Sequence, residues 1–161
     1  MRVKMGGGYM DYATAKRINQ LLTTVYGDIV RVEELALRTS QFKDISIKEV
    51  HAVDAISMYE HKTTSQVARE LRITPGTLTT MVNHLVRKDY VQRIKSDDDR
   101  RFVRLGLTRR GRLVYRAHES FHRKMVESFA KDMDDEQLQI IEKALLNLEA
   151  FLEFASPTPD R

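Results

Sequence analysis

Apolar residues recur at intervals of three and four in three long stretches of the chain, the spacing of one face of an α-helix. The pattern predicts helices over 11–37, 109–131 and 134–154, with Thr108 and Asp134 as the N-caps of the last two. In the middle helix, Leu113, Val114, Ala117, Phe121 and Met125 are expected to face inward. These helices carry most of the apolar surface of the chain.

Together the long helices have more apolar surface than a small domain can cover. The helices at the two chain ends are therefore expected to pack with those of a second copy in a dimerisation bundle. Simple packing within one chain is the alternative. The residues expected at the seam are Ile18, Leu22, Val25, Leu138, Ile141, Leu145, Leu148 and Leu152.

The middle of the chain carries the signals of two short helices joined by a tight turn. Thr63 and Gln66 have the spacing of a capping box, and Thr74 with Pro75 is a second helix start. Arg72 and Ile73 form the predicted turn. Upstream, Ser46 and Glu49 have capping-box spacing and indicate a scaffolding helix. The arrangement predicts a helix-turn-helix.

Two alternating segments follow, over 90–95 and 102–107, with a turn-rich tip at 96–101. Alternation of this kind predicts a two-stranded β hairpin, the wing. The fold class expected is therefore mainly α, with a winged helix-turn-helix over about 46–107 and dimerisation helices over about 11–37 and 109–154. Residues 10–155 are expected to form a single domain, preceded by an extension (1–9) and followed by a flexible tail (156–161).

The second short helix is expected to bury Leu78, Val82 and Leu85 and to expose a small polar face. Such a face fits a major groove, where hydroxyl, amide and guanidinium groups meet base edges. The candidate DNA contacts on the helices and the wing are Ser65, Gln66, Thr74, Pro75, Thr77, Thr79, Thr80, Asn83, His84, Arg87, Lys88, Arg93, Lys95, Asp99, Arg100 and Arg101.

Charge is concentrated in this region. Residues 87–112 include ten Lys or Arg and four Asp, a net charge of +6, whereas the whole chain has +4 and the remainder therefore −2. A basic block on a mildly acidic protein indicates phosphate binding, because neutralised phosphates release counterions. A solvated basic surface is the alternative.

The chain has no cysteine, which excludes disulfides and thiolate metal ligands. It has no apolar run long enough to span a bilayer and no secretory segment. We therefore expect no membrane partner, and we expect a cytoplasmic, nucleoid-associated location.

The order of elements and the motif Asp99-Arg100-Arg101, followed by Leu107-Thr108 and Gly111, resemble the MarR family of winged-helix regulators. The resemblance implies that Asp99 orients an arginine and that a wing arginine reaches the minor groove. The runs 42–51 and 113–126 look like the FabT type, a repressor of fatty-acid-synthesis genes. That type implies a homodimer on an AT-rich inverted repeat, long-chain acyl-acyl carrier protein as corepressor, no cofactor and no catalysis.

One motif points elsewhere, because His118-Glu119-Ser120-Phe121-His122 matches H-E-x-x-H. A catalytic zinc site also needs a third ligand and a substrate cleft, so a peptidase is not expected. A zinc-responsive regulator using His51, His118 and His122 is the alternative function, with Glu33, Glu34 and Glu49 as conceivable carboxylate ligands. The remaining interpretation is that His51, His118 and His122 bind no metal and are structural histidines held by hydrogen bonds.

Overall fold

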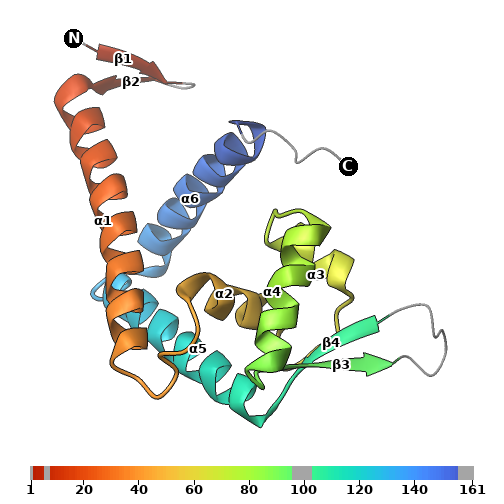
Figure 1. Ribbon diagram of the computed structural model, residues 1–161. Coiled ribbons are helices and arrows are strands. Elements are labelled where there is room, and N and C mark those ends of the chain that lie inside the picture. The colour runs from red at the N-terminus through yellow and green to blue at the C-terminus, as the bar shows by residue number, and fades with distance from the viewer. Residues whose placement is uncertain (1, 6–7, 96–102, 156–161) are drawn as a thin grey trace. The chain divides into compact units, whose positions relative to one another are not determined.

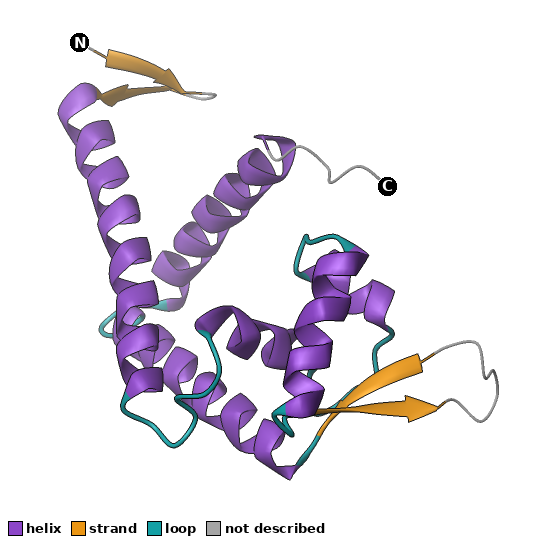
Figure 2. Cartoon of the chain, in the orientation of Figure 1, coloured by secondary structure: helices purple, strands orange, loops and turns teal. Residues whose placement is uncertain are grey.

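The computed structural model describes residues 2–5, 8–95 and 103–155, which form helices and two antiparallel hairpins (Figures 1 and 2). The chain divides into two compact units, residues 1–47 and 48–161. The element bounds are β1 Arg2–Met5, β2 Gly8–Asp11, α1 Tyr12–Arg38, α2 Ile47–Ile56, α3 Thr64–Glu70, α4 Pro75–Arg87, β3 Val91–Lys95, β4 Val103–Leu107, α5 Arg109–Phe129 and α6 Asp135–Ala155.

The first unit consists mainly of the long helix α1 and the hairpin that precedes it. Strands β1 and β2 pair in antiparallel register, with Arg2 opposite Asp11. The Asp11 carboxylate then caps α1 by accepting bonds from the backbone N–H groups of Ala13 and Thr14, both at 3.0 Å. The helix was predicted to within one residue. The hairpin was not, since the sequence analysis treated 1–9 only as an extension.

Helix α1 carries an exposed apolar stripe. Ile18, Leu22 and Val25 are 43%, 44% and 52% exposed in the single chain. Isolated exposed apolar residues are ordinary, but a repeating stripe of them on one helix face marks an interaction surface.

The second unit is built around a small apolar core shared by α2, α3, α4 and the wing. Ile56, Leu78, Leu85, Tyr90 and Leu105 are fully buried. The three predicted inward residues of α4 are all buried, which confirms its orientation. The predicted turn between α3 and α4 is also present, and Arg72 adopts φ 54°, a left-handed conformation that reverses the chain.

The wing is a two-stranded sheet joined to a third short segment. β3 and β4 pair with Val91 opposite Leu107. Thr63, just before α3, forms an isolated bridge with Arg104. The Leu105 N–H donates to the Lys62 carbonyl at 2.8 Å. These bonds fix the wing against the start of the helix-turn-helix.

Helix α5 begins close against the core. The Thr108 hydroxyl caps it by accepting from the Gly111 N–H at 3.1 Å. A Cβ atom at Gly111 would lie 2.0 Å from the Tyr90 carbonyl oxygen, so only glycine permits this approach. Of the stripe expected to face inward, only Val114 is buried, while Leu113 is 44% exposed. The single chain therefore leaves most of this stripe uncovered.

Helix α6 begins where the sequence predicts. Asp134 accepts from the Gln137 N–H at 2.8 Å, and the Gln137 side chain accepts from the Asp134 N–H at 3.0 Å. No residue of α6 is buried. Nor is any helix in the described part of the chain long and apolar enough to cross a lipid bilayer.

Candidate nucleic-acid interface

The exposed face of α4 carries the polar residues that the sequence singles out. Thr77, Thr79, Thr80, Asn83 and Arg87 are all exposed. The N-cap bond from Thr77 N to the Thr74 hydroxyl, at 3.2 Å, fixes the first turn of the helix, with Pro75 at its start. The buried side of α4 holds this face outward, as the helix-turn-helix prediction requires.

Two threonine hydroxyls on this face are already donating within the helix. Thr79 Oγ1 donates to the Pro75 carbonyl at 2.8 Å, and Thr80 Oγ1 donates to the Gly76 carbonyl at 3.2 Å. A hydroxyl that donates in this way keeps its lone pairs for other donors. These oxygens therefore suit the exocyclic amino groups of adenine or cytosine, and the methyl groups suit thymine.

Asn83 contacts the wing. Arg93 Nη2, on β3, donates to Asn83 Oδ1 at 2.6 Å, and both side chains are exposed. The sequence analysis placed both residues at the interface but did not predict their contact. This hydrogen bond joins β3 to α4.

The remaining helix candidates lie around the same surface. Ser65 and His84 are exposed. Gln66 is exposed too, and its Oε1 accepts the Thr63 N–H at 2.8 Å in the predicted capping box. Its side chain is therefore engaged in holding α3, which leaves mainly the amide nitrogen for a phosphate oxygen.

The wing tip lies outside the described residues. Asp99, Arg100 and Arg101, to which the family resemblance gave the minor-groove role, belong to it. Lys95 pairs with Val103 through the β ladder. The minor-groove role of the tip stays a prediction.

Several cations of the basic block bind groups of the protein itself. Arg104 donates to the His61 carbonyl and Arg112 to the Leu107 carbonyl, at 2.9 Å and 2.8 Å. Arg110 donates to the Lys88 carbonyl at 2.9 Å and lies 4.3 Å from the centroid of the Tyr90 ring. These bonds leave the charge in place, so the block still attracts phosphates while it also tightens the fold.

Lys88, one of the candidate DNA contacts, forms an ion pair within the protein. Its Nζ lies 2.9 Å and 3.0 Å from the two carboxylate oxygens of Glu49, which is only 8% exposed. An ammonium group in a partly buried ion pair is poorly placed to bind a phosphate. Arg87 beside it is exposed, and a DNA contact by either cation stays a prediction.

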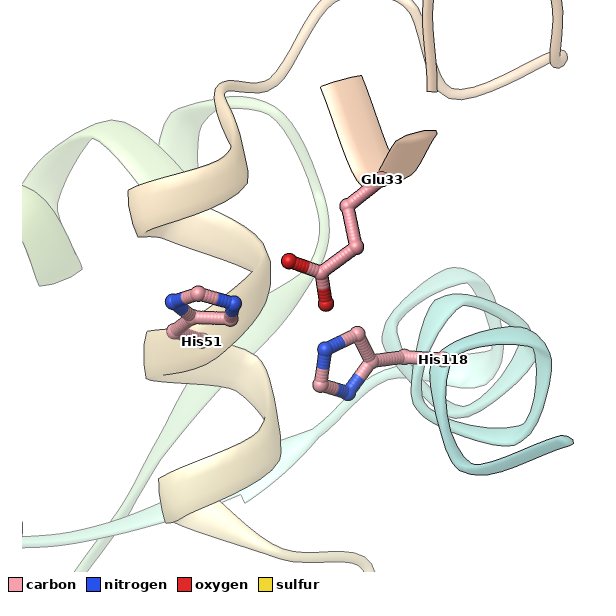
Figure 3. A group of neighbouring side chains, drawn as sticks. All are labelled: Glu33, His51 and His118. Atoms are coloured by element: carbon pink, nitrogen blue, oxygen red, sulfur yellow. The ribbon is translucent and has the colours of Figure 1, made fainter. Parts of the chain in front are cut away.

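A cluster of histidines lies between α2 and α5, apart from the DNA-facing surface. The His51 and His118 ring centroids are 5.4 Å apart (Figure 3). His118 Nε2 and His122 Nε2 are 3.0 Å apart. These three residues, with Asp54, Glu119, Arg123, Val126 and Glu127, line a cavity of about 720 Å³.

Asp54 is the member of this cluster that the sequence analysis missed. Its Oδ1 lies 3.4 Å from His118 Nδ1, a long contact, and the bond with the His118 side chain is the main cause that lowers the pKa of Asp54. The signal was available, because Asp54 follows His51 by three residues and so shares its face of α2. The structure thus brings the three predicted histidines together and adds a carboxylate.

Comparisons with known proteins agree with this fold. The family model described as "MarR family" matches residues 45–103, the span of the helix-turn-helix and most of the wing. The HTH-type transcriptional regulator PchR of Bacillus subtilis (strain 168) is 24% identical over 162 residues, covering 88% of this chain and 95% of that protein.

Solved structures give a stronger match. Streptococcus pneumoniae FabT, crystallised in complex with DNA, is 46% identical, with a TM-score of 0.79 over 88% of this chain and 99% of that one. MepR of S. aureus, also in a DNA complex, shares the fold at 19% identity, with a TM-score of 0.68 over 82% and 94% of the two chains. The chain therefore belongs to the MarR family, and it is a DNA-binding transcriptional regulator of the winged-helix type.

Proposed function

We propose that the protein is a homodimeric repressor of fatty-acid-synthesis genes that binds an AT-rich inverted repeat with long-chain acyl-acyl carrier protein as corepressor. The observation that carries this proposal is the 46% identity with FabT, which extends over 88% of the chain rather than over the winged helix-turn-helix alone. Family membership as a transcriptional regulator also supports the expectation that the H-E-x-x-H match is not a peptidase site.

The DNA-facing surface supports an inverted repeat. In a two-fold dimer, two copies of α4 enter successive major grooves about 34–36 Å apart, so the two half-sites are related by the same symmetry. Thr77, Thr79, Thr80 and Asn83 would face base edges, and Arg87 would contribute charge. Each contact follows from the exposed face described above.

The apolar faces of α1 and α6 support the dimer. An apolar groove of about 530 Å³ between α5 and α6 is lined by Leu138, Ile141, Leu145, Leu148 and Leu152 among others. All five are residues that the sequence analysis assigned to dimerisation. We assign this groove to a second copy of the chain, because most of its lining is apolar and continues the exposed stripe of α6, with Arg72, Glu142 and Glu149 as its charged members.

A corepressor can act on such a dimer only by binding its DNA-competent state more tightly than the other state. Acyl-acyl carrier protein would then raise the affinity for DNA, and DNA would raise the affinity for acyl-acyl carrier protein by the same factor. This reciprocity gives the proposal two independent readouts.

The test is fluorescence anisotropy with a labelled duplex that carries an AT-rich inverted repeat, and with a shuffled duplex of equal composition as control. Acylated carrier protein is added in one arm and unacylated carrier protein in another. We expect the acylated form alone to tighten specific binding by about fivefold or more. Equal affinity in the two arms contradicts the corepressor, and equal affinity for the two duplexes contradicts sequence-specific repression.

The second candidate function is a zinc-responsive regulator. The observation that favours it is that His51, His118 and His122 line one cavity. The 3.0 Å separation of His118 Nε2 and His122 Nε2 is a hydrogen bond between the two rings, which a zinc ion would have to replace. Zinc titration monitored by calorimetry, with His118→Ala as the matched variant, tests it. Absence of binding at micromolar zinc removes this candidate and leaves the first untouched.

A further inference from the structure

The wing strand β3 contacts the DNA-facing side of α4 through Arg93 and Asn83. We infer that Arg93 is a positioning residue: it orients the Asn83 amide for reading a base edge and thereby helps to determine the operator sequence. The observation is the bond from Arg93 Nη2 to Asn83 Oδ1, at 2.6 Å. The inference rests on the proposed binding to a specific operator, which it deepens by assigning a role to a residue that was expected only to supply charge.

The chemistry of the two side chains settles which way the amide is turned. A guanidinium group has only N–H donors, so the atom facing it has to be the amide oxygen. The Asn83 nitrogen then faces away from Arg93 and presents its two donors. Purine N7, guanine O6 and thymine O4 are the acceptors that the major groove offers to such a group. Arg93 thus selects the donor end of Asn83 for readout.

The position from which Arg93 reaches Asn83 is fixed by the wing. Arg93 lies opposite Leu105 in the β ladder, and Leu105 is fully buried. The Leu105 backbone N–H in turn donates a hydrogen bond to the Lys62 carbonyl oxygen at 2.8 Å. Because this strand is anchored, only the Arg93 and Asn83 side chains have to be ordered for their hydrogen bond to form.

Arg93 can serve a phosphate and Asn83 at the same time. The guanidinium has five N–H donors in a planar fork, and its bond to a neutral amide leaves its charge intact. Lysine keeps the charge, but its ammonium nitrogen is one bond closer to the backbone than the Arg93 Nη2 that reaches Asn83, so Arg93→Lys separates the two roles. It retains the attraction to phosphate and loses the hold on the amide.

Arg116 provides a control for the change of arginine to lysine. It lies on α5, its side chain is exposed, and it is not among the candidate DNA contacts. Arg116→Lys therefore makes the same chemical change away from the Asn83 amide. Differences between the two lysine variants report on the position of Arg93.

The experiment starts from a duplex selected out of a random pool by the unaltered protein. Each base pair of one half-site is then changed in turn, and affinities are measured for the unaltered protein, Asn83→Ala, Arg93→Lys, Asn83→Ala/Arg93→Lys and Arg116→Lys. Circular dichroism and thermal unfolding confirm that every variant folds. The salt dependence of binding is recorded for each, because it counts phosphate contacts independently of base readout.

We expect Asn83→Ala to lose discrimination of about ten- to a hundredfold at one base pair. Arg93→Lys should lose most of the discrimination at that same pair and keep the salt slope, and the double variant should match Asn83→Ala. Arg116→Lys should leave the discrimination intact. Full discrimination by Arg93→Lys, or additive losses in the double variant, overturns the inference. Failure of the unaltered protein to select any sequence would instead overturn the proposed function.

Discussion

The ammonium group of Lys88, at the end of α4, lies 2.9 Å and 3.0 Å from the two carboxylate oxygens of Glu49 in α2. The carboxylate is nearly buried and the ammonium is one-third exposed. This ion pair therefore joins α4 to α2. Arg87, the preceding residue, points to solvent instead. Two adjacent cations of the basic block thus differ in their surroundings, since Lys88 is in an ion pair and Arg87 is exposed.

Replacing Lys88 with methionine should lower the free energy of unfolding by about 1–3 kcal/mol, because Glu49 loses its ammonium partner in a poorly solvated place. The salt dependence of DNA binding should stay the same. Arg87→Met should do the reverse, with stability within about 0.5 kcal/mol and a salt slope lower by about one. Urea unfolding and anisotropy at several salt concentrations measure both. A salt slope reduced by Lys88→Met would return Lys88 to the interface.

Gly111 is the position at which α5 comes closest to the core. Gly111→Ala would place a methyl group 2.0 Å from the Tyr90 carbonyl oxygen, which is backbone and cannot swing away. Relief of the clash requires a shift of the helix start, so we expect a loss of about 2–4 kcal/mol in thermal or urea unfolding. Gly76→Ala is the control, since a Cβ there meets nothing within 4 Å. Equal stability of the two variants would contradict the packing described.

Asp54 gives a pH-dependent prediction. Its pKa is lowered from its ordinary value of 3.8, mainly by the bond with His118. A lowered pKa in the folded state means stability that is present above about pH 4 and disappears as pH falls through the folded value. The stability lost by Asp54→Asn relative to the native chain should therefore be largest above about pH 5 and shrink as the pH falls toward 3.

The same unfolding series should include Glu119→Gln, which removes an exposed carboxylate from the same cavity. Because Asp54 is only half-buried, we expect an effect of no more than about 1 kcal/mol. Chelator in every buffer keeps metal ions out of the comparison. A deficit of Asp54→Asn that grows as the pH falls would reverse the sign and contradict the assignment.

Local rules predicted much of this fold because caps and turns depend on neighbours in the sequence. The capping box at Thr63, the N-cap at Asp134 and the helix start at Thr74 all formed as predicted. The buried stripe of α4 followed from its spacing alone. The β1–β2 hairpin was missed although Arg2-Val3-Lys4-Met5 alternates polar and apolar residues, because four residues are too few to separate a strand from an extension by pattern alone.

Contacts between distant side chains could not be read in the same way. The count of charges over 87–112 placed Lys88 and Arg93 in a basic block but did not indicate that Lys88 contacts Glu49, 39 residues earlier, or that Arg93 contacts Asn83, 10 residues earlier. Those partners depend on how α2 and β3 lie against α4. Similarly, the inward stripe of α5 was predicted from periodicity, which marks an apolar face but not whether a single chain covers it.

Helix α6 allows the dimer itself to be tested. None of its residues is buried in the single chain, and Leu145, at 53% exposure, lies on the apolar groove assigned to a second copy. Leu145→Asp should place charge in the dimer seam and shift the protein to monomers in analytical ultracentrifugation, with little change in helix content. Affinity for the inverted repeat should fall by about a hundredfold or more, because two half-sites no longer bind together. Lys143→Asp, an exposed position on α6 outside the groove lining, controls for added charge. A Leu145→Asp protein that remains dimeric would show that the groove is covered by something other than a second copy.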